Sequence, residues 1–206
     1  MKLYFAPNAC SLSPHIVLQE LGLSYDLVCV NNRTKRTSEG GDFREINPKG
    51  YVAALVIDSG EVLTEGPALL QYLADLRPEA GLAPASGTLA RVRLQEWLNY
   101  ITSEVHAGSS PLFDEELPEA ARNIFKSRLV KRLGLIEARL AEHAYLLGDG
   151  FSVADAYLFT VLEWMPALAV DLVGFANVTA YVERIAARPS VVAARAREAR
   201  IDCPQG

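Results

Sequence analysis

Residues that build disulfide frameworks and metal sites are scarce in this 206-residue sequence. It contains 3 cysteines and 3 histidines, and Cys10, Cys29 and Cys203 show no paired spacing. An odd number of widely separated cysteines argues against a disulfide framework, and the missing Cys-x-x-Cys pattern argues against a zinc site. We therefore expect no metal, and each thiol needs its own interpretation.

Basic residues are also fewer than acidic ones. The sequence has 20 Lys and Arg residues against 25 Asp and Glu residues, which gives a formal net charge of -5. Such a chain lacks the positive field that draws proteins to phosphate backbones or to anionic lipid. We expect neither nucleic acid nor a membrane among its partners.

Long hydrophobic runs are missing as well. The most apolar stretch, residues 156–169, is shorter than the roughly 20 residues that a membrane span needs, and it contains Glu163 and Pro166. It therefore predicts a buried helix. The start of the sequence reaches Pro7 before a signal-peptide core could form, which favours a cytoplasmic protein.

Apolar residues make up 50% of the sequence, enough for one large or two small domains. The first part alternates short β-rich runs with helical periodicity: strands are expected over 2–5, 25–30, 54–57 and 61–64, and helices over 12–21 and 66–76. The resulting order, βαβ followed by ββα, predicts a thioredoxin-like domain rather than a dinucleotide-binding one.

The rest of the chain shows only helical periodicity. A stretch rich in Pro, Gly, Ala and Ser ends the first domain, and helices are expected over 89–108, 118–144, 153–169, 178–187 and 191–199. We predict an α/β domain over 1–80, a linker over 81–87 and an all-helical domain over 88–206. Ser152 and Asp155 have the spacing of a capping box, which predicts a helix start.

Cys10 lies between the first strand and the first helix. Two interpretations fit it: a reactive thiolate stabilised by the positive end of the helix, or a small buried hydrophobe. Ser11 is expected as the N-cap of this helix, although its hydroxyl could also donate to a nearby sulfur. Cys29, inside a predicted strand, is interpreted as a core residue, and no role is expected for Cys203.

A polar stripe marks the helix over 89–108. Asn99, Ser103 and His106 are spaced at i, i+4 and i+7, so they share one face of an α-helix, which faces water or a site. His106 is either a hydrogen-bonded surface or interface histidine or part of that site. His15 and His143 are interpreted as structural.

The tripeptide Thr64-Glu65-Gly66 ends a predicted strand and begins a helix. The backbone N–H of Gly66 can meet a carboxylate while Glu65 meets an ammonium, so a zwitterionic amino-acid group fits both. The simpler alternative is that Glu65 complements the helix dipole.

Several short motifs occur together along nearly the whole chain: Met1-Lys2-Leu3-Tyr4, Ala9-Cys10-Ser11-Leu12, Asn47-Pro48-Lys49-Gly50, Leu63-Thr64-Glu65-Gly66, Gln71-Tyr72-Leu73-Ala74-Asp75, Glu96-Trp97-Leu98-Asn99-Tyr100, and Ala154-Asp155-Ala156-Tyr157-Leu158-Phe159-Thr160. With these motifs the sequence resembles the beta class of bacterial glutathione transferases. The resemblance implies a homodimer that uses glutathione as cosubstrate.

The same resemblance implies a role for individual residues. Cys10 and His106 would lie beside the glutathione sulfur, and the Ser11 hydroxyl, as the neighbour of Cys10, is the further catalytic candidate. Glutathione itself would be bound by Lys35 at the glycine carboxylate, by the Val52 backbone at the cysteinyl part, by Glu65 and Gly66 at the γ-glutamyl end, and by Asn99 of the partner subunit. On its own, Lys35 would be interpreted as a solvated loop charge.

The sequence departs from the family pattern after Val52. The family has a cis proline at the next position, where this chain has Ala53. A cis bond costs about 3 kcal/mol for a non-proline residue and under about 1 kcal/mol for proline. The Val52–Ala53 bond is therefore either strained or trans with a reshaped loop, and we expect weakened glutathione binding.

Three functions remain open on these residues. The first is transfer of the glutathione sulfur to a small hydrophobic electrophile held against the helical domain. The second is thiol-disulfide exchange through a mixed disulfide of Cys10 and glutathione. The third is a binding or regulatory protein that has lost turnover and sequesters apolar ligands.

Overall fold

The computed structural model describes residues 1–205 and divides them into two compact units. The first unit combines residues 1–80 with the end of the chain from residue 187, and the second spans residues 81–186. Within residues 1–205, every helix is either too short or too polar to cross a membrane.

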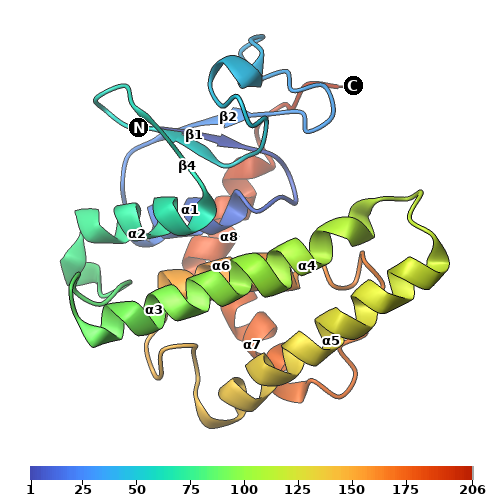
Figure 1. Ribbon diagram of the computed structural model, residues 1–206. Coiled ribbons are helices and arrows are strands. Elements are labelled where there is room, and N and C mark those ends of the chain that lie inside the picture. The colour runs from blue at the N-terminus through green and yellow to red at the C-terminus, as the bar shows by residue number, and fades with distance from the viewer. Residues whose placement is uncertain (206) are drawn as a thin grey trace. The chain divides into compact units, whose positions relative to one another are not determined.

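The first unit is built on a four-stranded mixed sheet with the order β2-β1-β3-β4 (Figure 1). Strand β1 pairs in parallel with β2 and antiparallel with β3, and β3 pairs antiparallel with β4. This confirms the predicted thioredoxin-like domain. Its strands and helices are β1 (Lys2–Phe5), α1 (Leu12–Glu20), β2 (Asp26–Cys29), η1 (Phe43–Glu45), β3 (Ala54–Val56), β4 (Val62–Thr64), α2 (Gly66–Leu76) and η2 (Pro78–Ala80).

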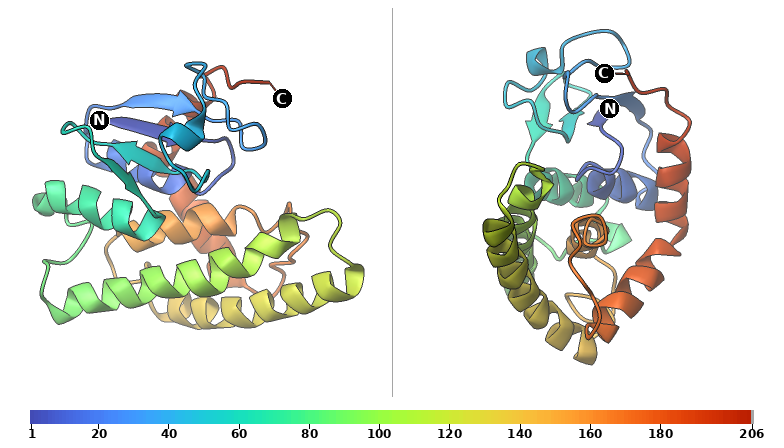
Figure 2. Two further views of the ribbon diagram at one scale, coloured as in Figure 1. Left: turned by 45° about the horizontal axis from the view of Figure 1, so that its top comes forward. Right: turned by 90° about the vertical axis from the view of Figure 1, so that its right-hand side faces the viewer.

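Alternating side chains give the sheet two buried faces. Helices α1 and α2 lie side by side on one face, and the segment with the short helix η1 covers the other (Figure 2). On the η1 side, Tyr4 and Val28 pack with Phe43 and Val52 in one apolar cluster. Because side chains alternate along a strand, the neighbouring residues of β1 and β2 point to the helices instead.

The last helix, α8 (Pro189–Glu198), belongs to the first unit. Sequence periodicity placed it in the helical domain over 88–206, and the structure differs because its polar contacts lie on α1. Arg188 Nε donates to Glu20 Oε1 at 2.9 Å, and Glu198 Oε1 lies 2.7 Å from Nδ1 of the buried His15. The structural role expected for His15 therefore includes a contact with Glu198 that holds α8.

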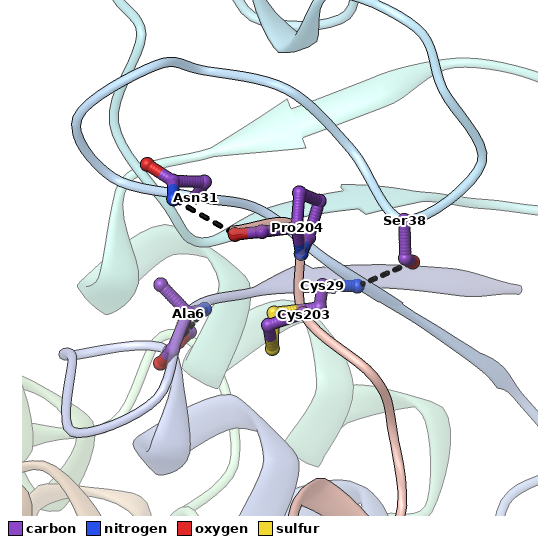
Figure 3. Close-up of a disulfide and its surroundings, with 7 residues drawn as sticks. Ala6, Cys29, Asn31, Ser38, Cys203 and Pro204 are labelled. Carbon is purple, nitrogen blue, oxygen red and sulfur yellow. Dashed lines mark hydrogen bonds between the residues drawn. A yellow bond between two sulfur atoms is a disulfide. The ribbon is translucent and has the colours of Figure 1, made fainter. Parts of the chain in front are cut away.

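A disulfide joins Cys29, at the end of β2, to Cys203, 174 positions later in the sequence (Figure 3). The interpretation of Cys29 as a core residue is confirmed by its burial, whereas the expectations that the cysteines stay unpaired and that Cys203 has no role are wrong. Cys29 is indeed fully buried, but the segment after α8 brings Cys203 against it, with 5.3 Å between the two Cα atoms. The pairing depends on the position of α8, which spacing alone does not reveal.

The second unit is all-helical, as predicted. Helices α3 and α5 run antiparallel, side by side (Figures 1 and 2). Between them, Tyr100 Oη donates to the Arg132 carbonyl at 2.9 Å. The elements are α3 (Leu89–Tyr100), a π-helix η3 (Ile101–His106), α4 (Ala107–Ser109), η4 (Ser110–Phe113), α5 (Glu119–Glu142), α6 (Val153–Leu162) and α7 (Ala176–Ala186).

Helix α6 is the buried centre of the second unit, and every one of its residues is buried. It starts with the predicted capping box, in which Asp155 Oδ2 accepts from the N–H and the hydroxyl of Ser152. The helix ends at Leu162 and not near residue 169 as predicted. Pro166 has no N–H to donate to the Leu162 carbonyl, so the chain continues in turns.

Candidate functional site

Cys10 lies in the turn between β1 and α1 and is the free cysteine among residues 1–205. Its thiol donates a hydrogen bond to the backbone carbonyl of Val52 at 3.1 Å. Burial raises the pKa of the Cys10 thiol to about 11, since backbone N–H groups at Cys10 and Ala53 only partly oppose it and the Glu65 charge adds to it. Of the two interpretations that the sequence leaves open for Cys10, the raised pKa favours the buried, protonated thiol.

Ser11 occupies the N-cap position of α1 but does not cap it with its side chain. The hydroxyl of this fully buried residue instead accepts from the Ala6 N–H at 3.1 Å and donates to the Ala6 carbonyl at 3.3 Å. The predicted side-chain cap is therefore wrong, because Ser11 ties the helix start back to the end of β1. The same two bonds leave its hydroxyl engaged inside the protein.

The segment 47–53 forms the loop that receives the Cys10 thiol. Asn47 is buried and shapes the loop, since its carbonyl accepts from Gly50 N–H at 2.8 Å and its side-chain amide donates to the Tyr51 carbonyl at 2.7 Å. Gly50 adopts φ 71°, a conformation that suits glycine. The peptide bond between Val52 and Ala53 is cis.

One end of this loop reaches the start of helix α2. Lys49 Nζ lies 2.5 Å from Glu65 Oε1 and donates to Thr64 Oγ1 at 3.1 Å. Gly66 is the first residue of α2, so its N–H has no partner within the helix and can donate a hydrogen bond to an anion. Lys49 was not singled out in the sequence, although it stands in the Asn-Pro-Lys-Gly motif.

The middle of the loop reaches Lys35. The Lys35 ammonium lies over the ring of the exposed Tyr51, 5.7 Å from the ring centroid. Burial, and to a lesser extent the charge of Arg44, lowers the pKa of Lys35. Lys35 is therefore a half-buried cation next to the loop, which separates it from the solvated loop charges that the sequence alone suggested.

These contacts connect the predicted site residues of the first unit through one segment. Within 47–53, Lys49 contacts Glu65, Tyr51 lies under Lys35, and Val52 accepts from Cys10. The segment thus brings together a cation, a carboxylate, a helix N-terminus and a thiol. Such a set can hold a flexible molecule with an ammonium and carboxylates at its ends.

In the second unit, His106 is the last residue of the π-helix η3 and points at α6. Its Nδ1 lies 2.6 Å from the hydroxyl of Tyr157, and its ring packs edge-on against Trp164 with 4.9 Å between centroids. Burial lowers the pKa of His106 below its ordinary value. The imidazole is therefore neutral at pH 7 and able to accept a proton.

The π-helix also changes the polar stripe expected on α3. Asn99 is exposed, with its side-chain amide donating to the Gln95 carbonyl, and Ser103 is exposed next to it. His106 is instead half-buried, because the wider π-turn takes more residues per turn and shifts the following side chains around the axis. The prediction that all three residues share one α-helical face is therefore wrong for His106.

No group of three or more metal-ligating side chains occurs within residues 1–205. The candidate site of the first unit instead offers groups for hydrogen bonds and ion pairs: ammonium, thiol and backbone N–H groups that donate, and a carboxylate that accepts. These groups suit an organic anion or zwitterion.

Family models and known proteins agree with this geometry. Residues 9–76 match the glutathione S-transferase N-terminal domain, and residues 97–189 match the glutathione S-transferase C-terminal domain. The chain is 42% identical over 191 residues to glutathione S-transferase GstA of Escherichia coli O157:H7, covering 93% of this chain and 95% of that protein.

Solved structures give the same result. A sphingomonad glutathione S-transferase complexed with glutathione is 41% identical with a TM-score of 0.94, covering 97% of this chain and 100% of that one. The beta class glutathione S-transferase of Sphingomonas chungbukensis is 44% identical with a TM-score of 0.93, covering 96% and 98%. Both units of the chain match over most of their length, and the chain belongs to the glutathione S-transferase family.

Proposed function

We propose that this enzyme binds glutathione on the first unit and transfers its sulfur to a small hydrophobic electrophile. The observation that carries the proposal is the segment 47–53, which connects Lys35, Cys10 and Glu65 through direct contacts. Each of these groups complements one part of a γ-glutamyl tripeptide, which has a carboxylate at one end and an ammonium at the other.

The two ends of glutathione define the polar contacts. The Glu65 carboxylate binds the γ-glutamyl ammonium, and the N–H of Gly66 at the start of α2 binds the neighbouring carboxylate. Lys35 binds the glycine carboxylate, and the Val52 backbone pairs with the cysteinyl part. In this proposal Asn99 reaches the γ-glutamyl end of glutathione on the partner subunit of a homodimer.

The reaction forms a carbon–sulfur bond and breaks the S–H bond of glutathione. The neutral His106 accepts the thiol proton, and the sulfur attacks the electrophile, whose leaving group departs with the electron pair of the broken bond. Cys10, as a neutral thiol, has one hydrogen to donate: when glutathione binds, this hydrogen passes from the Val52 carbonyl to the glutathione sulfur and stabilises the thiolate. Ser11 has a supporting part, since its bonds to Ala6 hold the turn that carries Cys10.

Thiol-disulfide exchange at Cys10 is the second candidate, and it requires the Cys10 thiolate as the nucleophile. A pKa of about 11 leaves roughly one thiol in ten thousand ionised at pH 7. The raised pKa therefore favours conjugation. A loss of reductase activity but not of conjugation in Cys10→Ala would assign the two activities to different groups.

The test is conjugation of glutathione to an activated aryl halide, followed by absorbance, with wild type, His106→Ala and Cys10→Ala. We expect saturable turnover in the wild type and a loss of kcat of about a hundredfold or more in His106→Ala, in the range of general-base contributions. Absence of turnover together with binding of hydrophobic dyes would instead identify a binding protein. Sedimentation at several concentrations tests the homodimer, and cell fractionation tests the cytoplasmic location, which stays a prediction.

A further inference from the structure

The chain segment after α8 is tied to the first unit at two neighbouring points. Cys203 forms the disulfide with Cys29, and the next residue, Pro204, accepts a hydrogen bond from Asn31 Nδ2 at 2.9 Å (Figure 3). Asn31 follows β2 by two positions, so both points lie where β2 continues into the loop that carries Lys35. Neither bond takes part in the site described above.

Asn31 organises this loop from within. Its Oδ1 accepts from the backbone N–H groups of Arg33 and Thr34, both at 2.9 Å, and its carbonyl accepts from the Lys35 N–H at 2.8 Å. The side-chain oxygen of Asn31 thus shapes the turn, while its side-chain Nδ2 donates to the Pro204 carbonyl. The position of Pro204 therefore bears directly on the residue that shapes the turn.

Lys35 depends on such support. It adopts φ 61°, a left-handed conformation that a lysine rarely takes and keeps only where its surroundings hold it. The far end of the loop, at Ser38, is held at the disulfide as well. The Ser38 N–H donates to the Cys29 carbonyl at 2.8 Å, and Ser38 Oγ accepts from the Cys29 N–H at 3.1 Å. Both ends of the turn are therefore held at or next to Cys29: Asn31 follows it by two positions, and Ser38 is hydrogen-bonded to it.

We propose that Asn31 is a positioning residue for Lys35, and that the Cys29–Cys203 disulfide makes this positioning dependent on the thiol-disulfide state of the protein. With the disulfide formed, Pro204 is held against Asn31 and the loop presents Lys35. With the disulfide reduced, the last residues leave the Asn31 amide and glutathione affinity falls. The affinity step rests on the proposed function of Lys35.

Reduction needs two equivalents of a thiol, a class to which glutathione itself belongs. A thiolate attacks the half-buried Cys203 sulfur, because Cys29 is fully buried; the S–S bond breaks, a mixed disulfide forms on Cys203, and Cys29 takes up a proton. A second thiolate attacks the mixed disulfide and releases the Cys203 thiol. Two external thiols are oxidised to one disulfide, and both cysteines are reduced.

The test compares Cys203→Ser, Asn31→Asp and the double variant with wild type and with Asp202→Ser, a neighbouring exposed control that keeps the disulfide. Asn31→Asp retains the acceptor oxygen for Arg33 and Thr34 but removes the hydrogen that is donated to Pro204. We expect each single variant to raise the glutathione KM about fivefold, the factor of one hydrogen bond, with kcat unchanged.

The double variant should be no worse than either single variant, because both remove the same link. Additive effects of the two substitutions would overturn the link through Pro204 and Asn31. Should Cys203→Ser fold poorly, wild-type protein compared before and after reduction by a phosphine gives the same test on one sequence. Unchanged affinity on reduction, with thiol titration showing that the disulfide is open, would overturn the redox dependence.

Hydrogen exchange without glutathione separates this inference from the proposed function. We expect the amides of Arg33, Thr34 and Lys35 to exchange faster in Cys203→Ser than in wild type. Unchanged exchange would overturn the positioning role, whatever the affinity. Faster exchange with unchanged affinity in both Cys203→Ser and Lys35→Ala would overturn the affinity step and with it the glutathione role of Lys35.

Discussion

The thiol of Cys10 and the backbone carbonyl of Val52, 42 positions apart in the sequence, are joined by a hydrogen bond of 3.1 Å. The bond connects the turn before α1 to the loop over 47–53. It needs a protonated sulfur, and the raised pKa of Cys10 keeps the proton in place. In the unliganded protein Cys10 therefore acts as a donor that shapes the loop.

Cys10 should react slowly with alkylating agents near neutral pH. Because its pKa is about 11, the rate of reaction with iodoacetamide should rise tenfold per pH unit from pH 7 to pH 10 without reaching a plateau. Mass spectrometry of quenched samples measures the rate, and Cys10→Ala gives the background. A plateau below pH 8 would show a stabilised thiolate and contradict the donor role.

Stability should respond to the same ionisation at high pH. The unfolded thiol ionises near its ordinary value of 9.0 and the folded one near 11, so between these values the unfolded state loses the proton first. The free energy of unfolding contributed by Cys10 is complete below pH 9 and falls as the pH rises toward 11. Urea unfolding at pH 8 and pH 10.5 measures the difference, which should shrink in Cys10→Ala.

His106 should stay neutral at mildly acidic pH. Burial lowers its pKa below the ordinary 6.5, so the unfolded state binds a proton first when the pH falls through this range, and the free energy of unfolding drops with it. Proton NMR of the imidazole should show a midpoint below 6.5, against a histidine-containing peptide as reference. A midpoint above 6.5 would remove His106 as a neutral acceptor at pH 7.

Glu65 and Lys49 form an exposed ion pair, and substitution of the two residues should change the glutathione KM to different extents. Exposed pairs contribute under about 1 kcal/mol, so Glu65→Gln and Lys49→Gln should both unfold nearly as wild type does. Only Glu65→Gln removes the carboxylate that binds the ammonium, and it should raise the glutathione KM about tenfold. Equal losses of affinity in the two variants would show that the pair, rather than the carboxylate, matters.

Asp155 should be a strong determinant of stability. Its carboxylate accepts from Ser152, from the Leu146 N–H at 2.9 Å and from the Tyr181 hydroxyl at 3.0 Å, all inside the second unit. Asp155→Ala leaves these buried donors unpaired, and we expect a loss of about 3 kcal/mol in chemical denaturation. Ser152→Ala removes one donor only and should cost about 1 kcal/mol. A loss below that of Ser152→Ala would refute the network.

The strands and most helix starts were predictable because they depend on local signals. The Asp58-Ser59-Gly60 turn marks the β3–β4 hairpin, and the Ser152–Asp155 spacing marks α6. Local position indicated Cys10, Glu65 and Gly66 as candidates, since each lies between a strand and a helix. Lys35 carries no local signal and came from the family resemblance. What distinguishes Lys35 in the structure is Tyr51 beneath its ammonium, a contact across a loop.

The features that sequence reasoning missed depend on contacts between distant segments. The Cys29–Cys203 pairing exists because α8 returns to α1, and the polar contacts that hold it, such as Arg188 on Glu20, span 168 positions. The π-helix turns His106 toward Tyr157, and helical periodicity assumes a constant turn that hides this shift. The raised pKa of Cys10 likewise reflects burial, which a helix-start argument omits.

The most direct test of the glutathione site is a titration of the isotope-labelled protein with reduced glutathione, followed by amide NMR. We predict saturable chemical-shift changes at the amides of Lys35, Val52 and Gly66. The Gly66 amide should no longer shift when the ligand lacks its γ-glutamyl group. Saturable binding that leaves these three amides unmoved, or no binding at all, would contradict the assignment of the site.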